Sequence, residues 1–274
     1  MIEKIIEAVH NNLSHWMTPD NLALCLACMD LTTLNTTDTE KRVVSFAQKV
    51  NRFKESFKDY PHPAAICVYP NWGKCVKENL AVEGVKVAVV AGGFPSSQTF
   101  LEIKLQECRM AVEQGADEVD IVLSLGKFLA GDLEGAANEI REIKRAIGEK
   151  HLKVILETGA LGGAENIAKA AHLAMDAGAD FIKTSTGKQE PAATPMAAIV
   201  MCNCIKEHYK ATGRKVGFKP AGGISTAKDA ISYLAIVETI LGKEWLNPSL
   251  FRIGASRLAN SLLSELEKKT VGYY

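Results

Sequence analysis

Eight short apolar runs, rich in valine and isoleucine, alternate along the chain with longer amphipathic stretches. This alternation is typical of strand–helix units around a parallel sheet. Amphipathic segments such as 134–150 and 226–241 are expected to form the intervening helices. We expect the strands at residues 22–30, 64–70, 85–93, 118–125, 152–158, 181–187, 216–223 and 250–256.

No linker rich in proline, glycine or serine separates the eight units. A closed barrel is therefore favoured over an open doubly wound sheet, which usually has fewer strands. We predict an α/β fold with one (β/α)8 TIM-barrel domain over residues 1–274, an N-terminal helix extension in 1–20 and a flexible C-terminal tail at 268–274. The open sheet is the alternative, but the glycine-rich loop 159–164 that would support it lacks the GxGxxG spacing and follows the fifth strand.

Charged residues are balanced, with 32 Lys plus Arg and 32 Asp plus Glu, so the formal net charge is zero. This balance argues against nucleic acid as a partner. Glu3, Lys4 and Glu7 interrupt the first apolar residues, so no signal-peptide core is expected. No run approaches the roughly 18 uncharged apolar residues of a membrane helix. We therefore expect a cytoplasmic protein that does not associate with membranes.

Seven cysteines are scattered through apolar segments, as expected for reduced thiols that pack as small hydrophobic residues. Cys25 and Cys28 form a CxxC pair, but no second cysteine pair or histidine lies nearby. Cys204 and His208 could share one helix face at a spacing of four residues. Two ligands do not make a zinc site, so the cysteine pattern alone predicts no metal site.

Lysines stand late in two of the apolar runs, Lys183 in FIKTSTGK and Lys219 in VGFKPAGG. Active sites of (β/α)8 barrels lie at the C-terminal ends of the strands, and Pro220 should end regular pairing beside Lys219. Either lysine alone could be a rim side chain or the partner of a buried carboxylate. Two of them on adjacent strands disfavour the charged form of one, which lowers its pKa. The resulting free amine can attack a carbonyl and form a Schiff base.

A short internal repeat aligns an aspartate with the first of these lysines. AVEQGADEVDIV (111–122) and AMDAGADFIKTS (174–185) share a helix end, a Gly-Ala-Asp turn and a strand. Asp120 and Lys183 therefore fall at matching positions and should lie at similar depth in the barrel. Asp120, together with Asp30 at the end of the first strand, could move protons directly or through a water. A helix cap or an ion-pair partner is the alternative role for each.

Three late strands end in small residues, which suggests an anion site. Backbone amides at such turns, with helix N-termini behind them, bind phosphate, often after strands seven and eight of a barrel. Lys188 and Ser256 would add side-chain donors. Simple turn chemistry is the alternative, because a similar AGG follows the third strand. The three segments are 185–188, 221–223 and 254–256.

Motifs across nearly the whole chain resemble, in order, those of the 2-deoxyribose-5-phosphate aldolase family: MDLTTLN (29–35), AICVYPNW (65–72), GADEVDIV (115–122), ILETG (155–159), FIKTSTGK (181–188), VGFKPAGGI (216–224) and RIGAS (252–256). The resemblance implies a class I aldolase without a metal or other cofactor. Such an enzyme reversibly splits 2-deoxy-D-ribose 5-phosphate into D-glyceraldehyde 3-phosphate and acetaldehyde. Three alternatives are another imine-forming phosphosugar aldolase, a barrel that binds a sugar phosphate without turnover, and a divalent-metal aldolase.

By motif, the resemblance implies that Lys183 is the Schiff-base lysine, Lys219 the second lysine that lowers its pKa, and Asp120 the proton relay. Asp30 resembles the aspartate that completes the polar network around the substrate. Because the chain ends in VGYY, Tyr274 is a candidate for assisting proton transfer. The alternative is a disordered terminus without a catalytic role. The implied phosphate site comprises Gly187, Lys188, Gly222, Gly223, Gly254 and Ser256.

One position departs from the family pattern. Arg257 stands where some members have a serine, and it could itself bind the phosphate. The expected partners are a small phosphosugar and further copies of the chain in a homo-oligomer, a dimer or a tetramer.

Overall fold

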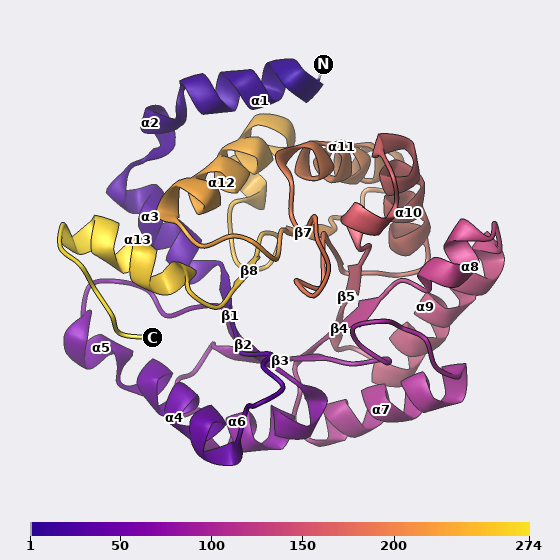
Figure 1. Ribbon diagram of the computed structural model, residues 1–274, viewed down its shortest axis with the longest axis horizontal. Coiled ribbons are helices and arrows are strands. Elements are labelled where there is room, and N and C mark those ends of the chain that lie inside the picture. Colours follow the sequence, from indigo (N-terminus) through magenta and orange to yellow (C-terminus); the bar gives the residue numbers. More distant parts are fainter. Residues whose placement is uncertain (1) are drawn as a thin grey trace.

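Residues 2–274 are described in the computed structural model, in which eight parallel strands form a barrel with helices around it (Figure 1). The strands pair in the order β7-β6-β5-β4-β3-β2-β1-β8. Isolated bridges, Phe218 to Phe251 and Ala221 to Gly254, join the two outer strands. The predicted (β/α)8 barrel is confirmed and the open sheet is wrong. The strands are β1 (Met29–Thr32), β2 (Ala65–Val68), β3 (Lys86–Val90), β4 (Glu118–Val122), β5 (His151–Ile155), β6 (Phe181–Lys183), β7 (Gly217–Lys219) and β8 (Ile253–Ala255).

Helices cover the outside of the barrel, and those predicted at 134–150 and 226–241 are confirmed as α9 and α12. None of the helices in residues 2–274 has the length and apolarity of a membrane span. The helices after the first strand are α4 (Glu40–Asn51), α5 (Phe53–Ser56), α6 (Gly73–Asn79), α7 (Leu101–Glu113), α8 (Leu125–Leu129), α9 (Leu133–Ile147), α10 (Ala164–Asp176), α11 (Pro195–Thr212), α12 (Ala227–Leu241) and α13 (Leu258–Glu267), with short 3-10 turns at η1 (Pro70–Trp72), η2 (Thr158–Ala160) and η3 (Lys243–Trp245).

The predicted N-terminal helix extension is confirmed as α1 (Ile2–Asn11) and α2 (Leu13–Trp16). Helix α1 packs across α11 and α12, and α2 packs on α12, outside the ring of strands (Figure 1). The extension therefore covers helices and leaves both ends of the barrel free of its residues.

The first predicted strand, 22–30, is wrong over most of its length. Helix α3 (Pro19–Ala27) occupies it, and β1 begins only at Met29. Thr18 caps this helix by accepting a hydrogen bond from the amide of Asn21, and Pro19 occupies its first position. A continuous apolar run does not distinguish a buried strand from a buried helix. The Thr-Pro start signal is the feature that could have separated them.

Two kinds of side chain fill the barrel interior. Near β1, β2 and β3 the filling is apolar and mostly small, with Leu34, Ala65, Cys67, Ala88 and Val90 in one cluster. The remaining interior is charged, because acidic and basic residues on β1, β4, β5, β6 and β7, and one just before β8, are buried there. Burial of charge demands pairing, so this half of the barrel defines the candidate site.

Candidate active site

Strand register brings the two predicted lysines together. Lys183 on β6 pairs directly with Lys219 on β7, so both side chains leave the same face of the sheet. Each Nζ donates a hydrogen bond of 2.8 Å to the same oxygen, Oδ2 of Asp120. The two nitrogens are therefore at most twice that distance apart. Strand β7 ends at Lys219, as predicted from Pro220.

Asp120 and Lys183 meet from alternate strands, β4 and β6. Asp120 is in register with Lys153 on β5, whereas Lys183 is in register with Ile155, two residues further along. Strands of a closed barrel are staggered in register, so this offset still lets the two side chains meet. Asp30 on β1 is a second carboxylate partner of Lys219, because Lys219 Nζ also donates to Asp30 Oδ2.

Three further charged residues belong to the same network, and the sequence analysis missed them. Lys153 Nζ donates to Glu118 Oε2 at 2.6 Å and to Asp120 Oδ1 at 3.0 Å. Arg252 donates to Glu118 Oε1 at 2.7 Å and to Asp30 Oδ1 at 2.6 Å. The available signal was charge inside apolar strands, since Glu118 stands two residues before Asp120 on the same face.

We call this network the barrel ion cluster: Asp30, Glu118, Asp120, Lys153, Lys183, Lys219 and Arg252. All seven are buried, and the most exposed is Arg252 at 4%. Four are cations and three are anions when fully ionised. An unpaired buried charge is expensive, so the cluster is best balanced when one lysine is neutral.

Contacts within the cluster decide which lysine loses its proton. Burial lowers the pKa of Lys183; Asp120 opposes this effect, Lys219 adds to it, and the pKa ends below its ordinary value. Burial acts on Lys219 too, but Asp120 and Asp30 outweigh it and raise the pKa. For Lys153, Asp120 and Glu118 likewise raise the pKa against the effect of burial. Of the three lysines, Lys183 therefore gives up its proton most readily.

The aspartates of the cluster remain ionised. Burial would raise the pKa of Asp120, but Lys153, Lys183 and Lys219 bring it well below its usual range. The pKa of Asp30 is also lowered, because Lys219 and Arg252 outweigh burial. Two buried carboxylates thus accept hydrogen bonds beside the lysine whose pKa is lowered.

A pocket of about 350 Å³ opens at the C-terminal ends of the strands. Within the described chain, Lys183 is the one member of the barrel ion cluster that lines it. Its size falls in the range of roughly 300–1,000 Å³ typical of small-ligand sites. All six predicted phosphate residues also line the pocket: Gly187, Lys188, Gly222, Gly223, Gly254 and Ser256.

Glycines shape the pocket wall. Gly222 has φ of +87°, and a Cβ there would lie 2.6 Å from Cβ of Ala192. A side chain would therefore push apart the loops that follow β6 and β7. A Cβ on Gly254 would lie 3.1 Å from Cε of Lys219, so this glycine leaves room for the lysine. Turns of this kind can present backbone N–H groups to an anion.

Comparison with known proteins agrees with this geometry. The chain matches the DeoC/LacD family of aldolases over residues 24–257. It belongs to this family. The human deoxyribose-phosphate aldolase is 43% identical over 256 residues, which cover 90% of this chain and 80% of the relative. The mouse deoxyribose-phosphate aldolase is 50% identical over 208 residues, which cover 75% of this chain and 64% of the relative.

A solved structure supports the same assignment. It is described as the unique tetrameric structure of deoxyribose phosphate aldolase from Aeropyrum pernix. The two chains share 25% identity with a TM-score of 0.67, over 95% of this chain and 96% of the other. The chain is accordingly an aldolase, a lyase enzyme.

Tyr274 is the predicted site residue that the structure of this aldolase keeps apart from the others. Its ring stacks on Phe53 with centroids 6.1 Å apart. Its amide donates to Asn260 Oδ1 at 3.0 Å, and the Asn260 side chain donates to its carbonyl at 2.9 Å. The C-terminus accordingly lies outside the ring of strands, between α13 and α5 (Figure 1).

Two basic side chains stand at the pocket rim of the aldolase. Lys188 Nζ donates to the carbonyl of Leu34 at 2.5 Å, which ties the loop after β6 to the loop after β1. Arg257, the departure from the family pattern, lines the pocket next to Ser256. Both rim cations stand near the glycine turns.

Proposed function

We propose that this aldolase reversibly cleaves 2-deoxy-D-ribose 5-phosphate to D-glyceraldehyde 3-phosphate and acetaldehyde through a Schiff base on Lys183. The observation that carries the proposal is the position of Lys183. It is the lysine with a lowered pKa in the barrel ion cluster, and it lines a pocket walled by glycine turns. The names of the human and mouse relatives point to the same substrate.

The reaction begins with attack of the free amine of Lys183 on the aldehyde carbon of the sugar. Loss of water from the carbinolamine gives an iminium ion, whose nitrogen can accept an electron pair. Asp120 and Lys219 supply and remove the protons of these steps, because both are hydrogen-bonded at the same point. Asp30 holds Lys219 in place.

Cleavage follows from the iminium ion. Removal of the proton from the 3-hydroxyl forms the aldehyde of glyceraldehyde 3-phosphate as the bond between C2 and C3 breaks. The electron pair of that bond moves to C2 and gives the enamine of acetaldehyde on Lys183. Protonation at C2 and hydrolysis then release acetaldehyde and restore the amine.

The 5-phosphate binds among the glycine turns after β6, β7 and β8. Gly187, Gly222 and Gly223 offer backbone amides, and Lys188 and Ser256 offer side-chain donors. Arg257 adds a guanidinium that can pair with a phosphate oxygen.

Borohydride trapping tests the chemistry. Wild type and Lys183→Ala are incubated with deoxyribose 5-phosphate, reduced and analysed by mass spectrometry. We expect an adduct on Lys183 in wild type and none in the variant. Binding of the sugar phosphate without any adduct would favour a barrel that binds but does not turn over. Faster turnover of another phosphosugar in a substrate panel would change the substrate but keep the imine.

Chelation separates this proposal from a divalent-metal aldolase. A Schiff base supplies the electron sink without a metal ion, so EDTA should leave the rate of cleavage unchanged. Complete loss of activity that zinc restores would defeat the proposal.

The role of Tyr274 stays a prediction, as does flexibility of the tail at 268–274. The phenol would reach the pocket only after the tail leaves α13, since Val271 and Tyr273 also hydrogen-bond to that helix. Deletion of residues 268–274 is expected to slow exchange of the acetaldehyde methyl protons with solvent if Tyr274 moves protons. An unchanged exchange rate would assign the tail no catalytic role.

The proposal includes a homo-oligomer, dimer or tetramer, in the cytoplasm. The relative from Aeropyrum pernix is described as tetrameric, and three large apolar side chains on or beside α7, those of Phe100, Ile103 and Met110, are exposed. All seven cysteines are free thiols, which suits a reducing compartment. Light scattering of the purified protein measures its mass in solution.

A further inference from the structure

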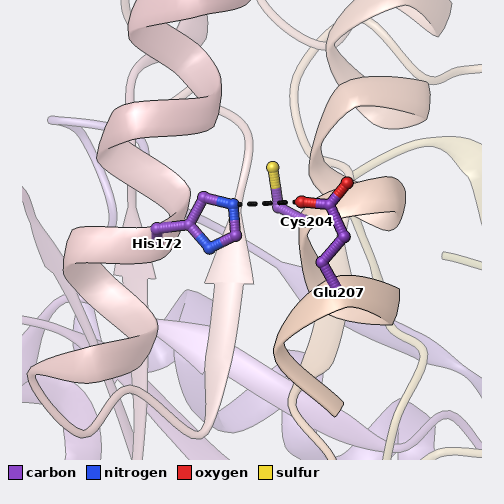
Figure 2. A group of neighbouring side chains, drawn as sticks. All are labelled: His172, Cys204 and Glu207. Atoms are coloured by element: carbon purple, nitrogen blue, oxygen red, sulfur yellow. Dashed lines mark ion pairs between the residues drawn. The ribbon is translucent and has the colours of Figure 1, made fainter. Parts of the chain in front are cut away.

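A second group of reactive side chains lies outside the barrel, between α10 and α11 (Figure 2). His172 comes from α10, and Cys204 and Glu207 come from α11. The candidate ligand atoms of all three lie within 4.8 Å of one another. Figure 2 shows the imidazole of His172 and the carboxylate of Glu207 pointing toward each other, with the thiol of Cys204 beside them. None of the three belongs to the barrel ion cluster or lines the candidate active-site pocket.

Helix packing explains how this group forms. Cys204 and Glu207 are three residues apart on α11, so they lie on the same face of the helix. Helix α10 packs along α11, which brings His172 to that face. From the sequence, Cys204 was paired with His208 on its own helix, and two ligands were too few. The structure contributes a ligand from the neighbouring helix, which the sequence spacing does not reveal.

The distance between His172 and Glu207 fits a shared ion better than a direct bond. His172 Nε2 and Glu207 Oε2 are 3.4 Å apart. A strong charge-assisted hydrogen bond would be about 2.8 Å long. Two ligands that each lie about 2.05 Å from a tetrahedral zinc ion are roughly 3.4 Å apart. The two side chains thus already have the separation of neighbouring ligands around zinc.

Ligand type and access select the kind of metal. A nitrogen, a sulfur and an oxygen ligand suit zinc and similar ions, whereas Mg²⁺ and Ca²⁺ take oxygen ligands. The side chains of His172 and Glu207 are 40% and 68% exposed, and Cys204 is buried beneath the surface. An ion can therefore reach the group from solvent. Burial, with a smaller effect of Glu207, raises the pKa of Cys204 to about 11, so binding would release the thiol proton.

We propose that His172, Cys204 and Glu207 bind one zinc ion, with the fourth position open to water. The ion would join α10 to α11, the helices that precede and follow β6. Its role is structural, because it fastens the layer behind the strand that carries Lys183 and contacts neither the pocket nor the barrel ion cluster. It therefore adds to the proposed aldolase function without taking part in the reaction.

Metal titration of the full-length protein tests the site. The protein is freed of metal with a chelator and titrated with Zn²⁺ by calorimetry and with Co²⁺ by absorption. We expect one ion per chain and a thiolate-to-cobalt charge-transfer band. Cys204→Ser should abolish the band. His172→Ala and Glu207→Gln should weaken zinc binding about tenfold or more, since even the outer partners of metal ligands contribute that much.

Two matched variants show whether the effect is specific. Glu165→Gln removes an exposed carboxylate from α10, and Cys75→Ser removes a partly exposed thiol. Both should bind zinc as wild type does. Unchanged zinc affinity in His172→Ala and Glu207→Gln, or absence of a charge-transfer band in wild type, would overturn the proposal.

A stability measurement gives a second readout. An ion that binds the folded state alone raises the melting temperature with its concentration. We expect zinc to stabilise wild type and Glu165→Gln more than Glu207→Gln, which changes an exposed side chain and should fold. Equal stabilisation of all three would contradict the site. Failure here leaves borohydride trapping on Lys183 unaffected, so the two proposals are tested separately.

Discussion

The ends of β6 and β7 carry the same residue in equivalent positions with opposite results. Lys183 and Lys219 are in register, both are buried, and both donate to one oxygen of Asp120. Lys219 has a second carboxylate, Asp30, and its pKa is raised. Lys183 has, among the described residues, Asp120 as its sole carboxylate partner, and its pKa is lowered. The comparison teaches that the number of carboxylate contacts, more than burial itself, decides which lysine has the lowered pKa.

Removal of the side-chain amine of Lys183, on β6, should have the largest effect on the reaction. Lys183→Met eliminates the proposed nucleophile, and we expect kcat to fall on the order of 10⁴-fold or more, as it does when other enzymes lose their nucleophiles. Because folding lowers the pKa of Lys183, its charged form is disfavoured in the folded protein, so the melting temperature should not fall. A large loss of stability in this variant would show that Lys183 is a charged ion-pair partner.

Removal of the amine of β7 should produce a different loss. Lys219→Met leaves Asp30 and Asp120 with fewer cations, which should destabilise the fold by about 3–5 kcal/mol. Loss of the neighbouring cation raises the pKa of Lys183, so the acidic limb of the kcat/KM profile moves to higher pH. Activity measured across pH, together with denaturant unfolding, checks both effects. An acidic limb that moves to lower pH would contradict the comparison.

Replacement of the shared carboxylate, Asp120, should shift the acidic limb in the opposite direction. Asp120→Asn removes the group that raises the pKa of Lys183, so that pKa falls further and the acidic limb moves to lower pH. Loss of proton transfer should still reduce kcat by roughly 10²–10⁴-fold. The pair of variants Lys219→Met and Asp120→Asn thus separates an electrostatic effect from general damage. General damage would shift the acidic limb in the same direction in both variants.

The smallest effect is expected at the pocket rim. Lys188→Met removes one of the proposed phosphate donors and leaves the barrel ion cluster intact. We expect KM to rise about tenfold, as for loss of a hydrogen bond to a charged group, with kcat nearly unchanged. Steady-state kinetics with the phosphorylated sugar and with deoxyribose itself checks this, because the unphosphorylated sugar should respond little.

Local sequence signals were sufficient to predict much of the fold and part of the candidate site. The strands that end in Lys183 and Lys219, and the glycine turns that follow them, could be predicted because each is encoded within a few residues. Helix α3 was missed because a continuous apolar run has no period that separates helix from strand.

Long-range contacts could not be predicted in the same way. Lys153, Glu118 and Arg252 join the barrel ion cluster from three different strand regions, and only the closed barrel shows which carboxylate each one meets. The group of His172, Cys204 and Glu207 could not be predicted for the same reason, since its members come from two helices. The charge or ligand chemistry of such residues marks them as unusual in the sequence. Their contact partners are known only from the fold.

Barrel closure itself uses the ion cluster. Strands β7 and β8 are joined by isolated bridges rather than by a full ladder. Lys219 on one side of this seam and Arg252 on the other both contact Asp30 on β1. A lysine in an unfolded chain keeps its ordinary pKa. The lowered pKa of Lys183 therefore arises only in the folded barrel, where its amine is buried beside Lys219.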